Sequence, residues 1–205
     1  MNFLAHAWLA GDAPADRLGG LMGDFVKGPL PAGLPPDIAE GVRLHRAIDS
    51  FADTHPAFRS ACARVPPERR RAAGILVDMF FDHFLARRWD EFSAVPLPHF
   101  TAAAYRLMAA HHALLPPRLQ RILPWMREDD WLASYAEVDA VAYALERMSQ
   151  RLSRPGLLAG AGSVLREEYP ALEADFLAFL PDALRFVETH RAGRISAAGS
   201  RTTAD

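Results

Sequence analysis

Helix-forming residues dominate this chain, and this imbalance constrains the fold more than any other feature. Alanine occurs 37 times and leucine 25 times, whereas valine, isoleucine and threonine occur 9, 5 and 5 times. Alanine and leucine favour helices, and β-branched residues favour strands. No alternation of apolar and polar residues continues for more than a few positions. We therefore predict an all-α fold of roughly seven to nine helices, taking the average helix length.

Paired prolines mark where several helices begin, because proline fits the first helical turn and interrupts a helix interior. Besides two short helices before Gly23, we predict helices over 36–55, 66–89, 98–113, 117–127, 135–153, 156–168 and 170–190. A length of 205 residues fits one domain. We assign residues 1–191 to that domain and expect the small and polar residues 192–205 to form a disordered tail.

Charge and cysteine content exclude several classes of protein. The net charge is −2, so no excess of positive charge indicates a nucleic-acid partner. Cys62 is the single cysteine, which rules out a disulfide within the chain and indicates a reduced, cytoplasmic location. The opening residues lack a basic segment and contain His6, so we expect no signal peptide. No run approaches the ~20 apolar residues of a membrane span.

One imidazole and two carboxylates share a side of the helix predicted over 36–55. His45, Asp49 and Asp53 follow one another at intervals of four residues, next to an apolar stripe that includes Leu44 and Ile48. Residues with this spacing lie on one helix face. The row fits metal ligands, and it also fits an ordinary solvated helix face.

A second group of polar residues lies in a strongly apolar helix. Asp78, Asp82 and His83 stand among Met79, phenylalanines and Leu85, so we expect this helix to be buried on all sides. A buried carboxylate requires a positive partner. Arginines such as Arg46, Arg87 and Arg88 would serve, and so would a divalent metal, with oxygen-rich sites favouring Mn²⁺, Mg²⁺ or Fe²⁺. His83 also fits a core histidine bonded to a carbonyl.

Two further candidates precede these helices. Asp24 lies in a turn bracketed by Gly23 and Gly28, where glycine allows the backbone to bend sharply and bring the carboxylate inward. It equally suits a plain turn residue. His6, within the first short helix, is a fourth and weaker candidate ligand.

Four sequence blocks together resemble the acyl-carrier-protein phosphodiesterase family, a divergent branch of the His-Asp (HD) metal phosphohydrolases. The blocks span Met1–His6, Gly23–Gly28, Leu44–Asp53 and Asp78–Trp89. The resemblance implies an HD-like helical bundle and a Mn²⁺-dependent hydrolase, with Mg²⁺ or Fe²⁺ as substitutes. The reaction would release 4′-phosphopantetheine from the serine of holo acyl carrier protein. The superfamily's adjacent His-Asp pair stands reversed here, as Asp82-His83.

The resemblance also implies roles for individual residues. Asp24, His45, Asp49 and Asp82 would hold the metal ion, and either Asp53 or Asp78 would accept a proton from the attacking water. Arg46 would bind a phosphate oxygen through its planar guanidinium. His83 would be a fifth ligand or the acid that protonates the departing serine oxygen.

An acidic carrier protein, which the resemblance implies as the partner, would dock on a basic surface. Available arginines are Arg69, Arg70, Arg71, Arg87, Arg88, Arg118, Arg121 and Arg127. Two other functions stay open at this point. An HD-type enzyme acting on a nucleotide or small phosphodiester would keep the metal residues without the docking surface, and a metal-free polar network would suit a helical binding protein.

Overall fold

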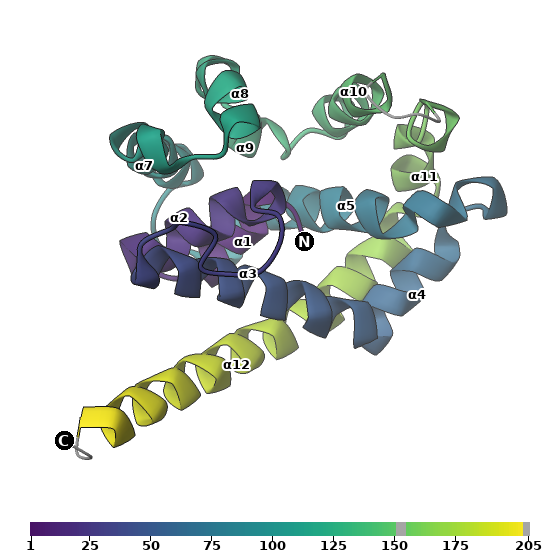
Figure 1. Ribbon diagram of the computed structural model, residues 1–205. Helices are drawn as coiled ribbons and strands as arrows, with labels where there is room; N and C mark the ends of the chain where they lie inside the picture. The colour runs from purple at the N-terminus through teal and green to yellow at the C-terminus, as the bar shows by residue number, and fades with distance from the viewer. Residues whose placement is uncertain (151–154, 203–205) are drawn as a thin grey trace.

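The computed structural model describes residues 1–150 and 155–202, and within them every regular element is helical (Figure 1). The all-α prediction is confirmed, but the predicted number of roughly seven to nine helices is too low for the described residues, because several segments divide into shorter helices. The α-helices are α1 (Phe3–Leu9), α2 (Pro14–Met22), α3 (Pro36–Thr54), α4 (Pro56–Arg64), α5 (Ala73–Arg87), α6 (Trp89–Phe92), α7 (Leu97–Ala110), α8 (Pro117–Glu128), α9 (Trp131–Ser134), α10 (Val138–Ser149), α11 (Gly162–Glu167) and α12 (Tyr169–Thr202). Short 3₁₀ turns are η1 (Gly23–Phe25), η2 (Pro67–Ala72), η3 (His112–Leu114) and η4 (Pro155–Leu157). α3 and α8 begin at the second proline of a pair, as predicted, and α2 and α4 begin at single prolines.

The predicted helix over 66–89 is divided into three pieces. Its first turns form η2, α5 begins at Ala73, and Arg88 ends α5 before the short helix α6. The segment predicted as 156–168 divides in the same way, into η4 and α11. Part of the predicted helix 135–153 is α10, while residues 151–154 lie outside the described part of the chain.

The last helix extends into the segment expected to be a disordered tail. α12 runs from Tyr169 to Thr202, and residues 203–205 lie outside the described residues. Ala and Arg in this segment are good helix formers, so the helix that enters it can continue. Arg194, in this extension, pairs with Asp16 of α2 at 3.0 Å. Figure 1 shows the C-terminal part of α12 leading away from the other helices.

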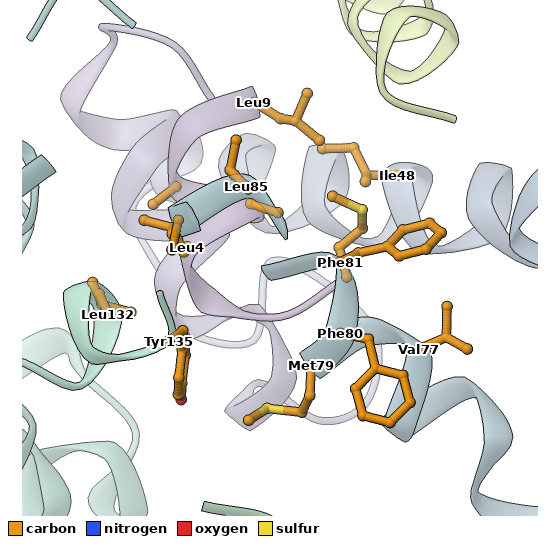
Figure 2. Close-up of a cluster of buried hydrophobic side chains, with 14 of the residues drawn as sticks. Leu4, Leu9, Ile48, Val77, Met79, Phe80, Phe81, Leu85, Leu132 and Tyr135 are labelled. Atoms are coloured by element: carbon orange, nitrogen blue, oxygen red, sulfur yellow. The ribbon is translucent and has the colours of Figure 1, made fainter. Parts of the chain in front are cut away.

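The core surrounds α5, the most apolar helix of the sequence. Val77, Met79, Phe80, Phe81 and Leu85 of α5 are buried, as the sequence predicts. Figure 2 shows these side chains with Leu4 and Leu9 of α1, Ile48 of α3, and Leu132 and Tyr135 from the α9 segment. Burying side chains of this kind contributes about 1.5–3 kcal/mol each. The core thus fixes α1 and α3, which carry the polar residues of interest, against α5.

α2 and α3 pack with almost no side chain between them. A Cβ atom on Gly19 would lie 2.3 Å from the backbone carbon of Gly41, and one on Gly41 would lie 2.5 Å from Ala15 O. Only glycine allows backbones to approach this closely. The contact holds the end of α2, and therefore the turn η1 that follows it, beside the middle of α3.

Candidate metal centre

Three segments bring together two imidazoles and two carboxylates, which we call the ligand group: His6 of α1, Asp24 of η1, and His45 and Asp49 of α3. His6 Nε2 lies 3.0 Å from Asp49 Oδ1, and His45 Nε2 lies 3.2 Å from Asp49 Oδ2. Asp24 Oδ1 lies 3.5 Å from His45 Nε2. Ligand atoms of His6, His45 and Asp49 all lie within 4.8 Å of one another. Since a metal–ligand bond is about 2.1 Å long, one ion can bridge such a set after small adjustments.

His45 is oriented by contacts on the far side of its ring. Its Nδ1 lies 3.0 Å from the carbonyl oxygen of Gly20, which can accept a hydrogen bond from it. With a proton on Nδ1, Nε2 is the nitrogen that faces Asp24 and Asp49, and it is the one an ion would bind after Nε2 loses its own proton. A Cβ atom on Gly23 would lie 2.3 Å from His45 Cγ. The Gly23 position therefore needs glycine for the imidazole to occupy this place.

His6 completes the group from the opposite side. Its ring stacks on the ring of His45, with centroids 3.8 Å apart, and its side chain is 1% exposed. Within the described part of the chain, His6 Nδ1 is buried and makes no hydrogen bond. Burial, helped by the nearby His45, lowers the pKa of His6 to about 4. His6 is therefore neutral at pH 7, the state in which imidazole binds a metal.

The other three members of the group, His45, Asp24 and Asp49, are charged in the metal-free protein. Burial opposes a charge on His45, but hydrogen bonds to Asp24 and Asp49 outweigh it and raise the pKa of His45 to about 9. Burial likewise opposes ionisation of both carboxyls, yet the contact with His45 lowers the pKa of each below its usual value. A protonated imidazole thus neutralises two carboxylates where a cation would otherwise be needed.

Asp78 lies beside this group, next to the α-amino group of Met1. The amine donates a hydrogen bond of 2.5 Å to Asp78 Oδ1 and lies 3.4 Å from Asp49 Oδ1. Burial opposes its charge, but Asp78 and Asp49 raise the pKa of the amine to about 10. For Asp78, burial outweighs the neighbouring amine and raises the pKa of the carboxyl. A positive charge therefore separates Asp78 from Asp49.

Asp82 is placed differently from the prediction that made it a metal ligand. Its Oδ2 accepts a 2.8 Å hydrogen bond from the backbone N–H of Leu4, and its Oδ1 accepts one of 3.1 Å from Ala5. The first N–H groups of a helix have no partner within the helix, and a carboxylate satisfies them well. Burial outweighs these bonds and raises the pKa of Asp82 to about 7. Asp82 therefore holds the start of α1 through the two residues directly before His6.

His83 also faces away from the ligand group. Its Nδ1 lies 2.8 Å from the carbonyl oxygen of Tyr135, and its Nε2 lies 3.1 Å from the hydroxyl of Tyr169. This corresponds to the alternative of a core histidine bonded to a carbonyl. Burial lowers the pKa of His83. Both ring nitrogens have protein partners, so the structure does not bring His83 to the predicted ligands.

Arg46 and Asp53, the remaining candidates on α3, have different surroundings. Arg46 lines a cavity of about 370 Å³ together with Asp24, His45 and Asp49, and donates a 2.9 Å hydrogen bond to the carbonyl oxygen of Val26. Asp53 is exposed one turn beyond Asp49 and does not line this cavity. The structure thus joins Arg46 to the ligand group and leaves Asp53 outside it.

Comparison of the sequence with known proteins assigns the chain to a family. The sequence profile described as "Acyl carrier protein phosphodiesterase" matches residues 1–183, which include every residue of the ligand group. The chain belongs to the acyl carrier protein phosphodiesterase family. Relatives with that name are found in Yersinia pestis (37% identical over 188 residues, 90% of this chain and 96% of the relative) and Serratia proteamaculans (36% over 186 residues, 90% and 96%). Another, from Pectobacterium atrosepticum, is 34% identical over 192 residues, which cover 93% of this chain and all of the relative.

The family assignment confirms the resemblance drawn from the four sequence blocks. No solved structure matches the chain, so the HD-like arrangement of the helices stays a prediction. Within residues 1–150 and 155–202, no helix is long and apolar enough to cross a membrane.

From the sequence, His6 is only a weak candidate ligand, whereas the structure places it within the ligand group. The signal was its position in the short apolar run Leu4–Leu9, where a polar side chain is either buried with a purpose or out of place. Nothing in the sequence indicated that the Met1 amine would lie between two carboxylates, since the pairs are 48 and 77 residues apart.

Proposed function

We propose that this chain is a divalent-metal-dependent phosphodiesterase that acts on acyl carrier protein. The bond hydrolysed is the phosphodiester between a serine of holo acyl carrier protein and 4′-phosphopantetheine, which leaves apo acyl carrier protein. Family membership supports the reaction class and the protein substrate. The convergence of His6, Asp24, His45 and Asp49 supports the metal dependence. We place the reaction in the cytoplasm, in line with a single cysteine that forms no disulfide within the chain.

The ligand group is the observation that carries this proposal. Two imidazoles and two carboxylates make a mixed nitrogen and oxygen site, which suits Mn²⁺ or Fe²⁺, with Mg²⁺ as a weaker fit. His45 is oriented by Gly20 as a metal-bound histidine is by its outer hydrogen bond. Asp82 is left out of the set because both of its oxygens are bound to α1. When bound, the ion would neutralise phosphate oxygens and make water acidic enough to attack near neutral pH.

The chain's own residues then bind the phosphate and move the proton. Arg46, in the wall of the cavity, binds a non-bridging phosphate oxygen through its guanidinium. Asp78, whose pKa is raised by burial, accepts the proton of the attacking water. The same carboxyl can return the proton to the serine oxygen as it departs. We favour Asp78 over Asp53 because Asp78 lies beside Asp49, with the Met1 amine between them, whereas Asp53 is exposed.

An intact-mass assay tests the proposal. Holo acyl carrier protein is incubated with chelator-treated protein, with and without Mn²⁺, and its mass is followed over time. We expect loss of the phosphopantetheine mass only with Mn²⁺, and almost none with His6→Ala or His45→Ala. His99→Ala, an exposed histidine on α7, is the matched control and should behave as wild type. Release of phosphopantetheine by His45→Ala at the wild-type, Mn²⁺-stimulated rate would refute the proposal. Hydrolysis of nucleotides from a test panel, with no hydrolysis of the carrier protein, would refute it as well.

A further inference from the structure

Some of the arginines available for docking a protein partner already form ion pairs or hydrogen bonds within this chain, and others do not. Arg88 bonds Glu91 at 2.8 Å and Glu173 at 2.9 Å, and Arg87 lies 3.9 Å from Glu137. Arg69 donates to the carbonyl oxygens of Gly156 and Leu157 at 3.0 and 3.1 Å. A guanidinium whose N–H groups are already used within the chain has fewer donors left for a partner. These three arginines are therefore poor candidates for recognition.

Arg118 is positioned differently, at the edge of the candidate metal centre. Its guanidinium carbon lies 5.7 Å from the centre of the Phe25 ring, within the range of a cation–π contact. Phe25 directly follows Asp24 and stacks on Phe3 with ring centres 5.9 Å apart. Arg118, in the first turn of α8, therefore lies beside η1. Arg118 is exposed, and no acidic side chain of the described residues forms an ion pair with it.

Lys27 provides a second cation at the same edge. It lines the cavity of the ligand group and is exposed, and the ion pairs of residues 1–150 and 155–202 do not include it. Arg121 lies one helical turn after Arg118, so both can face the same side of α8. We call Lys27, Arg118 and Arg121 the basic rim. A bound phosphate would occupy the cavity beside Arg46, whereas Arg118 and Arg121 do not line the cavity.

We propose that the basic rim binds an acidic surface of the protein that carries the phosphodiester, next to the attachment site. This inference rests on the proposed function and adds where its protein substrate docks. The observation that carries it is the Arg118 guanidinium, which lies over the ring of Phe25, the residue directly after Asp24. Arg118 has no ion pair among the described residues and lies outside the cavity wall that a phosphate would contact. A small phosphodiester has no part that reaches this far. The rim therefore distinguishes a protein substrate from a small one.

Steady-state kinetics of Arg118→Glu separate docking from chemistry. With holo acyl carrier protein, we expect KM to rise about tenfold or more at low salt, with kcat within about twofold of wild type. Hydrolysis of bis(p-nitrophenyl) phosphate, a small phosphodiester, should be unchanged. Arg118→Lys keeps the charge and should stay within about threefold of wild type in KM. Arg59→Glu on α4, an exposed arginine with the same change of charge, is the matched control and should leave KM unchanged.

Two results would overturn the inference. One is a KM for the carrier protein that Arg118→Glu leaves at the wild-type value. The other is an equal loss of activity toward both substrates, which would mean that Arg118 supports the cavity itself. Binding of holo carrier protein to His45→Ala, followed by fluorescence anisotropy, reads docking without turnover. Adding Arg118→Glu to that variant should weaken binding about tenfold. If wild type binds the carrier protein through Arg118 but releases nothing, the proposed function fails and the docking surface stands.

Discussion

Removing the carboxylate of Asp82 should destabilise the metal-free protein and, through α1, weaken the ligand group. The side chain is fully buried and bonds the N–H groups of Leu4 and Ala5 at 2.8 and 3.1 Å. Asp82→Ala leaves both donors without a partner, and each buried unpaired donor costs about 1–3 kcal/mol, or roughly 2–6 kcal/mol together. Relief of the buried charge offsets part of this at high pH, so we expect a loss of about 2–3 kcal/mol at pH 8.

The pH dependence of this loss has a definite sign. Burial raises the pKa of Asp82 from 3.8 in the unfolded chain to about 7 in the folded protein. The folded protein therefore holds this proton more tightly, and the associated stability is present below about pH 4 and lost as the pH rises through 7. Since Asp82→Ala lacks the group, the difference in stability between wild type and variant should grow as the pH falls from 8 to 5.

Urea unfolding of chelator-treated protein at several pH values measures both effects. Asp90→Asn, an exposed aspartate at the start of α6, is the control and should change the free energy of unfolding by less than about 0.5 kcal/mol. If Asp82 were a metal ligand with no contact to α1, its loss would lower Mn²⁺ affinity and leave the stability of the metal-free protein unchanged. Equal unfolding midpoints for metal-free Asp82→Ala and wild type would refute the capping role.

Three further predictions concern the ligand group and the phosphate. Mn²⁺ must displace the proton of His45, whose pKa is raised to about 9. Mn²⁺ affinity should therefore rise about tenfold per pH unit from pH 7 toward 9, with proton release detectable by calorimetry in different buffers. An affinity that does not change with pH would contradict this. In Gly23→Ala, the added Cβ would lie 2.3 Å from His45 Cγ and push the imidazole out of place. We expect Mn²⁺ binding, measured by calorimetry, to weaken roughly 10–100-fold. Unchanged affinity would contradict the requirement for glycine at this position. Arg46→Lys should lower kcat/KM roughly 10–100-fold with Mn²⁺ affinity unchanged, since lysine lacks the planar guanidinium; full activity would remove Arg46 from phosphate binding.

The helical fold and the segments of the site could be predicted from local sequence. Proline at the start of α3 and α8 and the apolar character of α5 are local signals. The structure confirms the two helix starts and the burial of α5. The division of residues 66–89 at Ala73 and Arg88 was not predicted, because a 3₁₀ turn and an α-helix have nearly the same local preferences.

The pairing of groups within the site required the tertiary structure. The spacing of His45 and Asp49 predicts that both lie on one face of α3. Asp24 and His6 were candidates from other segments, and only the structure shows that they meet His45 and Asp49 there. Asp82 and His83 were expected to be buried, and both are. Burial alone does not tell whether a carboxylate faces an ion or the start of a helix. That choice depends on where α1 packs against α5, which the residues around Asp82 do not encode by themselves.

The most direct test of the central claim is an anomalous difference map from crystals of the Mn²⁺-loaded protein, recorded at the manganese absorption edge. We predict a peak within bonding distance of His6 Nε2, His45 Nε2 and Asp49, with Asp24 at its edge, and Asp82 still bonded to Leu4 and Ala5. A peak on Asp82 or His83 instead, or an active crystal with no manganese between His6 and His45, would contradict this account.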